Sequence, residues 1–238
     1  MQHRAVQRRA LLAASGLVAG AVGLAARPTA ASAATATATE PIPETAAAAI
    51  HRLLSGNHRF ITGHSRHPHQ SLQRLHELAA GQDPFVITLG CADSRVSPEV
   101  LFDQGLGDIF DNRVAGNIVD DLLFGSIEYA VEHFAPPLLL VLGHERCGAV
   151  SATVEAIESG GTAPGHIGAI VEALRPIVTP VLDQSGDKVE NSVVANIKAQ
   201  ARALVDGSDI VREKVEAGEL AVVGARYDLD TGKVTLVR

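Results

Sequence analysis

Solid apolar runs alternate along this chain with stretches in which apolar and polar residues are interleaved. Runs at 85–89 and 138–142 have the length and composition of buried strands. We expect further strands at 109–114 and 220–227, and a last one at 233–237 after the turn Asp230-Thr231-Gly232. The interleaved stretches before and between these strands predict helices at 44–62, 72–80, 120–134, 148–158, 166–174, 190–205 and 209–217.

Strands that alternate with helices predict an α/β fold with a mainly parallel sheet. We expect a four-stranded parallel core plus a C-terminal antiparallel strand, flanked by helices and preceded by an N-terminal helical arm. Composition agrees with this expectation. Apolar residues make up 46% of the 238 residues, aromatic residues only 3%, and Trp is absent. The core must therefore be built from Ala, Val, Leu and Ile, which suits a parallel sheet covered by helices.

The first 33 residues have the features of an export signal. Arg8-Arg9 precedes a short, Gly- and Ala-rich apolar stretch at 10–26, and Ala31-Ser32-Ala33 is a small-x-small cleavage pattern. The paired arginines favour a twin-arginine signal, with an ordinary secretory signal as the alternative. We expect residues 1–33 to be removed, residues 34–43 to be a linker, and residues 44–238 to be the folded domain. The mature protein would then be secreted or periplasmic, in the cell-envelope space, with no membrane span.

Charge argues against a nucleic-acid partner. The formal net charge of the whole chain is −7. Without the four arginines of residues 1–33, 16 basic and 27 acidic residues remain, which is a formal net charge of −11. A nucleic-acid-binding domain carries a basic surface, and none is visible here.

Two of the predicted strands end in a glycine followed by a residue that can bind a metal. Cys91 follows the first strand, and His144 follows the second, with Cys147 at a His-x-x-Cys spacing. Sites in parallel sheets form at the carboxyl ends of strands. Two thiolates and one imidazole make a three-ligand zinc set that leaves one position open, which is the catalytic pattern. The alternatives for the two cysteines are a disulfide or buried free thiols.

Asp93 and Arg95 follow Cys91 closely enough to form an ion pair. An ionised Asp93 can accept a hydrogen bond from a zinc-bound water, and Arg95 would keep the carboxylate charged and turned away from the metal. If the pair broke, Asp93 could become a fourth ligand and displace the water. The alternative is an ion pair with a purely structural role. Ser97 and Pro98 predict a helix start that tethers this loop.

These motifs together resemble the β-class carbonic anhydrases. Cys-x-Asp-Ser-Arg at 91–95 is followed, 53 residues after the cysteine, by His-x-x-Cys-Gly at 144–148. The stretches 54–60, 107–117 and 127–131 are similar to the family's N-terminal helix, its central strand and turn, and its dimer-side helix. The resemblance runs from about residue 44 to the C-terminus and identifies residues 44–238 as the β-carbonic anhydrase domain.

The resemblance implies reversible hydration of CO2 to bicarbonate and a proton, by attack of a zinc hydroxide on CO2. It implies one Zn²⁺ per chain on Cys91, His144 and Cys147, with Asp93 and Arg95 as catalytic residues. Because two anionic thiolates make zinc a weaker acid than three histidines do, we expect a high working pH. The family forms dimers with active sites at the interface, so we expect a homodimer or tetramer.

The resemblance also implies a substrate pocket. By position, Gln82 matches the family's bicarbonate-contacting glutamine, and Phe110 and Tyr129 match its apolar pocket, which is partly lent by the neighbouring subunit. One departure is Asp111-Asn112, where the family usually has apolar residues. This departure puts the family's packing, or its subunit contact, in question at these two positions.

Two other functions are compatible with the same residues. A zinc hydroxide on this scaffold could hydrolyse carbonyl sulfide or carbon disulfide. A permanently shut, four-ligand zinc site would instead be structural, but Arg95 argues against that, since a shut site does not need Asp93 held away. A redox function is disfavoured because the chain contains no Cys-x-x-Cys motif.

Overall fold

The computed structural model describes residues 41–238, which form one compact unit. The predicted signal peptide and residues 34–40 of the predicted linker lie outside the described residues. Among residues 41–238, no helix combines the length and the apolar character that a membrane crossing requires.

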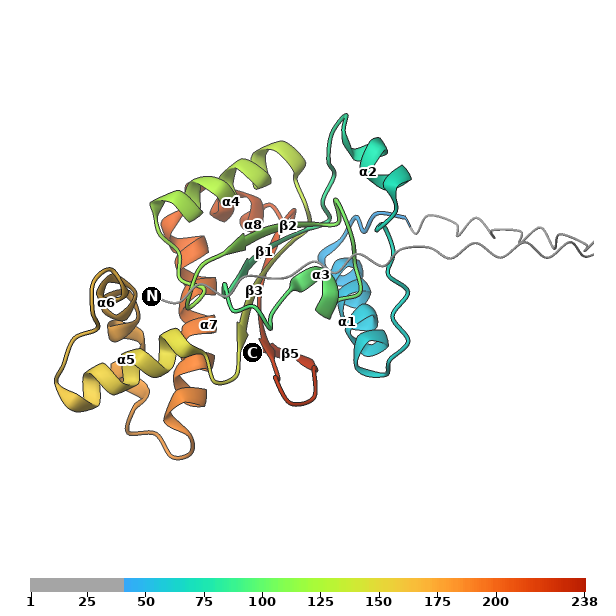
Figure 1. Ribbon diagram of the computed structural model, residues 1–238. Helices are drawn as coiled ribbons and strands as arrows, with labels where there is room; N and C mark the ends of the chain where they lie inside the picture. The colour runs from blue at the N-terminus through green and yellow to red at the C-terminus, as the bar shows by residue number, and fades with distance from the viewer. Residues whose placement is uncertain (1–40) are drawn as a thin grey trace, which may run out of the picture. The chain divides into compact units, whose positions relative to one another are not determined.

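A five-stranded sheet forms the centre of the fold (Figure 1). The strand order is β2-β1-β3-β4-β5. The first four strands are parallel, and β5 runs antiparallel to β4. The predicted four-stranded parallel core with a C-terminal antiparallel strand is therefore confirmed. The strands are β1 (Val86–Gly90), β2 (Ile109–Arg113), β3 (Leu138–His144), β4 (Ala221–Tyr227) and β5 (Val234–Val237).

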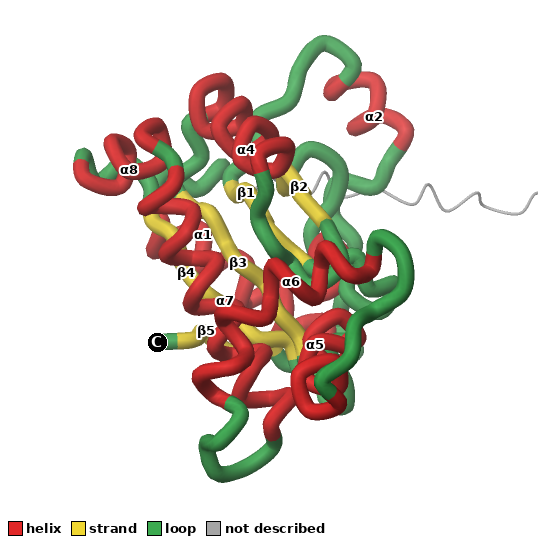
Figure 2. The backbone as a smooth tube through the Cα atoms, turned by 90° about the vertical axis from the view of Figure 1, so that its left-hand side faces the viewer, coloured by secondary structure: helices red, strands yellow, loops and turns green. Residues whose placement is uncertain are grey.

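Helices cover both faces of the sheet, and the elements confirm the predicted alternation. Against one face pack α4 (Asp121–Phe134) and α7 (Lys188–Gly207), several turns of which lie in front of the sheet in Figure 2. Around these two helices pack α5 (Gly148–Ser159), α6 (Ile167–Val178) and α8 (Asp209–Glu216). Against the other face pack α1 (Ala46–Ile61) and the short α3 (Pro98–Leu101). The remaining elements are α2 (Leu72–Leu78) and a 3₁₀ turn, Thr179–Val181.

The central strands are buried on both faces because their side chains serve two cores. Every residue of β1 and β3 is buried. Ile87 and Leu89 point into the core under α4 and α7, whereas Val86 points into the core under α1. Burying one such aliphatic side chain contributes about 1.5–3 kcal/mol. The continuous apolar runs in the sequence reflect this two-sided burial.

Helix α7 lies close to the sheet because two strand glycines leave room for one of its side chains. Ile197 is fully buried, and its side chain fills the space above Gly143 of β3 and Gly224 of β4. A Cβ on Gly143 would lie 2.5 Å from Cγ1 of Ile197. This contact fixes α7 directly beside the carboxyl end of β3.

Side-chain caps fix several helix starts. Thr45 accepts a hydrogen bond from the backbone N–H of Ala48, and Asp120, Asp187 and Ser208 make the equivalent bond at the starts of α4, α7 and α8. Each bond satisfies an N–H that has no partner inside the helix. Helix α6 differs from its predicted range, 166–174, because it continues through Pro176, with buried Val178 anchoring its last turn.

Candidate metal centre

Parallel pairing of β1 and β3 brings Cys91 and His144 together. Gly90 pairs with Leu142, so the residue that follows β1 lies beside the carboxyl end of β3, where His144 is the last residue. Cys147 is the N-cap of α5. One ligand atom from each of these three residues lies within 4.8 Å of the other two, and all three residues are buried. The structure thus brings together the three predicted ligands.

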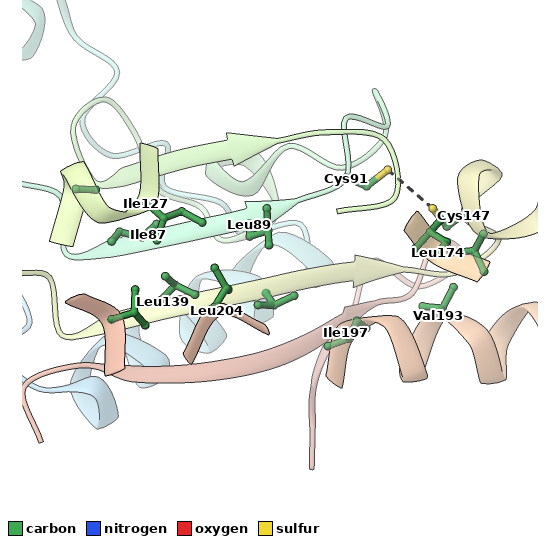
Figure 3. Close-up of a cluster of buried hydrophobic side chains, with 14 of the residues drawn as sticks. Ile87, Leu89, Cys91, Ile127, Leu139, Cys147, Leu174, Val193, Ile197 and Leu204 are labelled. Atoms are coloured by element: carbon green, nitrogen blue, oxygen red, sulfur yellow. Dashed lines mark hydrogen bonds between the residues drawn. The ribbon is translucent and has the colours of Figure 1, made fainter. Parts of the chain in front are cut away.

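The two cysteines are free thiols rather than a disulfide (Figure 3). Their Sγ atoms are 3.9 Å apart. Two thiolates at about 2.3 Å from a tetrahedral zinc would be separated by about 3.8 Å, so the spacing fits that metal. A hydrogen bond between the two sulfurs, in which either thiol could donate, lowers the pKa of the Cys91 thiol against the opposing effect of burial. The same hydrogen bond raises the pKa of Cys147.

His144 is oriented as a metal ligand. Its Nδ1 lies 2.8 Å from the backbone carbonyl of Glu145. A carbonyl can only accept, so Nδ1 carries the proton and the lone pair is on Nε2. Among the described residues, nothing hydrogen-bonds Nε2, although the side chain is fully buried. A buried nitrogen without a partner is costly, and a metal ion beside the two thiols would satisfy it.

Asp93 lies beside this cluster and is bound by Arg95. The guanidinium donates to both carboxylate oxygens, at 3.0 and 2.7 Å, and the backbone N–H of Arg95 donates at 2.9 Å. These hydrogen bonds hold the pKa of Asp93 well below its ordinary value. Oδ2 of Asp93 is also 3.9 Å from Nε2 of His144. The carboxylate is therefore ionised and turned toward Arg95, and it lies near Nε2 of His144, the nitrogen that a metal would bind.

Arg113, at the end of β2, holds the backbone of the same loop. Its guanidinium donates to the carbonyl of Cys91 at 3.0 Å and to that of Asp93 at 2.6 Å. The sequence motifs predict no role for this arginine beyond its place in the family's central strand. Only the pairing of β2 with β1 brings residue 113 next to residues 91–93.

The turn after β2 closes the other side of the cluster. The backbone N–H of Gly116 donates to Sγ of Cys91 at 3.4 Å. Gly116 has φ of +80°, as the third residue of a type II turn requires, and a Cβ there would lie 3.1 Å from Cβ of Ala149. The glycine allows the backbone to approach the thiol.

Gln82, Phe110 and Tyr129 are not brought to the cluster within one chain. Gln82 is exposed and precedes β1, whereas Cys91 follows it. Phe110 pairs with Ile87 near the amino end of β1, and its ring centroid is 6.4 Å from that of Tyr129. All three residues therefore lie toward the amino ends of the strands, opposite the metal centre, and Tyr129 is half exposed.

The polar pair Asp111-Asn112 is accommodated inside the chain by hydrogen bonds, which answers the question of packing at these two positions. The Thr88 hydroxyl donates to Asp111, and the Asn112 amide donates to the Thr88 carbonyl at 3.1 Å. Ser126 of α4 donates to the Asn112 side-chain oxygen. Burial raises the pKa of Asp111. The two side chains thus find hydrogen-bond partners where apolar residues were expected.

Comparison with known proteins shows similarity to carbonic anhydrases. Residues 86–234 match the family described as carbonic anhydrase. The chain is 41% identical over 189 residues to carbonic anhydrase 2 of Mycobacterium tuberculosis (strain ATCC 25618 / H37Rv), a match that covers 79% of this chain and 91% of that protein.

Two solved structures extend the similarity to the fold. The β-carbonic anhydrase of Coccomyxa, in complex with acetazolamide, is 29% identical with a TM-score of 0.62, over 78% of this chain and 84% of that one. A tetrameric β-carbonic anhydrase of Sordaria macrospora is 25% identical with a TM-score of 0.62, over 79% of this chain and 96% of that one.

Proposed function

The chain belongs to the β-class carbonic anhydrases, and from this premise we propose that it hydrates CO2 with one zinc ion held by Cys91, His144 and Cys147. The observation that carries the proposal is the buried Nε2 of His144, which has no hydrogen-bond partner among the described residues and faces two free thiols. Cysteine sulfur and histidine nitrogen are the ligands that zinc prefers.

The chain supplies three functions around the metal. Cys91, His144 and Cys147 would hold the zinc ion, which when bound would lower the pKa of a water molecule and so supply the nucleophile. Asp93 accepts the hydrogen bond that orients this nucleophile toward CO2. Arg95 keeps the Asp93 carboxylate ionised and turned outward. Should the Arg95 contacts break, Asp93 is close enough to the cluster to take the fourth ligand position and shut the site.

We propose that a second copy of the chain completes the substrate pocket. Gln82, Phe110 and Tyr129 lie at the opposite end of the sheet from the metal ligands, so they reach a metal centre only if it belongs to a neighbouring subunit. The tetrameric state of the Sordaria macrospora relative supports assembly into a homodimer or tetramer.

Stopped-flow CO2 hydration by the zinc-loaded chain, across about pH 6.5 to 9, tests the proposed activity. We expect a rate that climbs steeply with pH, because two thiolate ligands make the zinc a weak acid. No rate at any pH, with one zinc bound per chain, would overturn the proposal. A rate on carbonyl sulfide that exceeds the rate on CO2 would also overturn the proposal and would indicate carbonyl sulfide hydrolysis. The matched family and relatives are named for carbonic anhydrase, which supports CO2 as the substrate.

We also propose that the protein is exported, secreted or periplasmic, on the evidence of Arg8-Arg9 and the apolar stretch that follows. Fractionation of bacteria that express the full chain tests this proposal. We expect the mature protein outside the cytoplasm, and cytoplasmic retention when Arg8 and Arg9 are both replaced by Lys. Export that survives the replacement would indicate the ordinary secretory route, and a wild-type chain found in the cytoplasm would refute export.

A further inference from the structure

Helix α7 carries two buried amide side chains on the face that packs against the sheet. Asn196 is 1% exposed and Gln200 is 5% exposed, among neighbours such as Val193, Ile197 and Leu204 that form the core. Burying an amide is costly unless its polar atoms find partners. The positions are four residues apart, so both side chains leave the helix on the same face.

Their hydrogen bonds form a continuous chain that ends at the metal centre. The backbone N–H of Val119 donates to Oε1 of Gln200 at 3.0 Å. Nε2 of Gln200 donates to Oδ1 of Asn196, also at 3.0 Å. Nδ2 of Asn196 then donates to the carbonyl of Gly116 at 2.8 Å. The N–H of Gly116 donates in turn to Sγ of Cys91.

These bonds hold the turn at 114–119, whose first residue, Val114, is also hydrogen-bonded to Gly90 and Ala92. The turn is closed by one internal hydrogen bond, from the N–H of Asn117 to the carbonyl of Val114 at 2.9 Å. Asn196 and Gln200 hold it at three further points, which are the carbonyl of Gly116, the side-chain oxygen of Asn117 and the N–H of Val119. Helix α7 is a firm support because it has 20 residues and Ile197 is packed against β3 and β4.

We propose that Asn196 and Gln200 are positioning residues for the metal centre, which hold the turn at 114–119 so that the N–H of Gly116 donates to the Cys91 sulfur. The inference rests on the proposed zinc site. A hydrogen bond to a thiolate ligand withdraws electron density from sulfur, so it adjusts both how tightly the metal is held and how strongly the metal acts on water. Neither amide touches the ligands, and both act through the turn.

Metal binding by variants of the full chain tests this inference. Asn196→Leu keeps the approximate volume of the side chain and removes the hydrogen bond to Gly116. We expect zinc affinity, measured by competition with a chelator, to fall about tenfold to a hundredfold. With cobalt in place of zinc, we expect the thiolate-to-cobalt charge-transfer absorption to shift, since this band reports directly on the sulfur ligands.

Ser192→Ala is the matched control. Ser192 lies on the same face of α7 and is fully buried, but its hydroxyl bonds to the Lys188 carbonyl within the helix. We expect its zinc affinity and cobalt spectrum to equal those of the wild type. Gln200→Met removes the hydrogen bonds to Asn196 and Val119, which lie farther from Cys91. We expect it to change the zinc affinity and the cobalt spectrum in the same direction as Asn196→Leu, but by less. This second variant tests the inference if Asn196→Leu does not fold.

Wild-type affinity and an unshifted cobalt band in either folded amide variant would overturn the inference while leaving the zinc site intact. A wild-type chain that binds neither zinc nor cobalt would overturn the proposed function as well. The two failures are therefore distinguished by the wild-type measurement.

Discussion

At the scale of single residues, the metal centre depends on which way one carboxylate faces. Asp93 lies between Arg95, which binds both of its oxygens, and His144, whose free nitrogen is 3.9 Å away. Arg95 is more than half exposed, so water competes for its contacts with Asp93. The outward orientation is therefore a balance that a single substitution should change.

We expect Arg95→Ala to lower the CO2 hydration rate by about a hundredfold while one zinc per chain remains bound, because Asp93 loses the partner that turns it outward. Arg212→Ala is the control, since Arg212 is also partly exposed and pairs with Asp209 within α8. Stopped-flow rates and metal analysis check both variants. An Arg95→Ala enzyme with wild-type activity would show that Asp93 needs no partner.

Asp111 should make stability depend on pH. Its pKa is raised by burial, so the folded state favours the neutral carboxyl. Neutral Asp111 therefore stabilises the folded state at pH values below the ordinary pKa of an aspartate, and this stabilisation is lost as pH rises through the raised pKa of Asp111. Asp111→Asn keeps an oxygen for the Thr88 hydroxyl and removes the charge. We expect its free energy of unfolding, relative to wild type, to increase between about pH 4 and pH 7.

Urea unfolding at the two pH values measures this difference. Thr235→Val, on the far strand β5, provides a control that changes no charge. A difference between Asp111→Asn and wild type that stays constant with pH would mean that Asp111 ionises in the folded state as it does in the unfolded one.

At the scale of helices and strands, the sequence predicted the elements well because their burial leaves a plain pattern. The two-sided burial of β1 and β3 produces solid apolar runs, and the glycine after each run indicated where the ligands lie. Contacts between distant segments leave no such pattern. Arg113 and Asn196 act on a cysteine 22 and 105 positions away, and only the folded sheet brings them near it.

The surroundings of two glycines predict opposite effects for Gly→Ala substitutions, since Gly143 lies against α7 and Gly125 lies in open space. Gly143→Ala places a Cβ against the buried Ile197 and should lower the free energy of unfolding by about 1–3 kcal/mol. Gly125→Ala, inside α4, meets nothing within 4 Å among residues 41–238 and should raise it by about 0.5–1 kcal/mol. Denaturant unfolding of both variants measures the two changes in the free energy of unfolding. Equal effects of the two substitutions would contradict the tight packing of α7 on β3.

At the scale of the whole molecule, the proposed pocket requires two chains. Tyr129 and Phe110 form an aromatic group at one end of the sheet, and the metal ligands lie at the other. A residue in one chain would then serve the metal centre of its partner.

Mixed assemblies of two inactive variants test this arrangement. Cys91→Ser removes a metal ligand, and Tyr129→Ala removes part of the pocket. If Tyr129 serves the neighbouring chain, a mixed dimer contains one site with intact ligands and an intact pocket, so we expect CO2 hydration to reappear on co-expression. If each Tyr129 served its own chain, no site in the mixture would be complete, and the mixture would stay as inactive as its components.

The separation of the ligands along the chain also determines how the metal contributes to folding. Cys91 and His144 are 53 positions apart, and joining two points at that separation costs about 4 kcal/mol of chain entropy. The pairing of β1 with β3 over four positions offsets this loss of chain entropy without any metal. The metal-free chain should therefore keep its helices and sheet, unlike small domains that fold only when zinc binds. Zinc then raises the unfolding temperature by mass action, so a chelator should lower that temperature while leaving the circular dichroism spectrum unchanged.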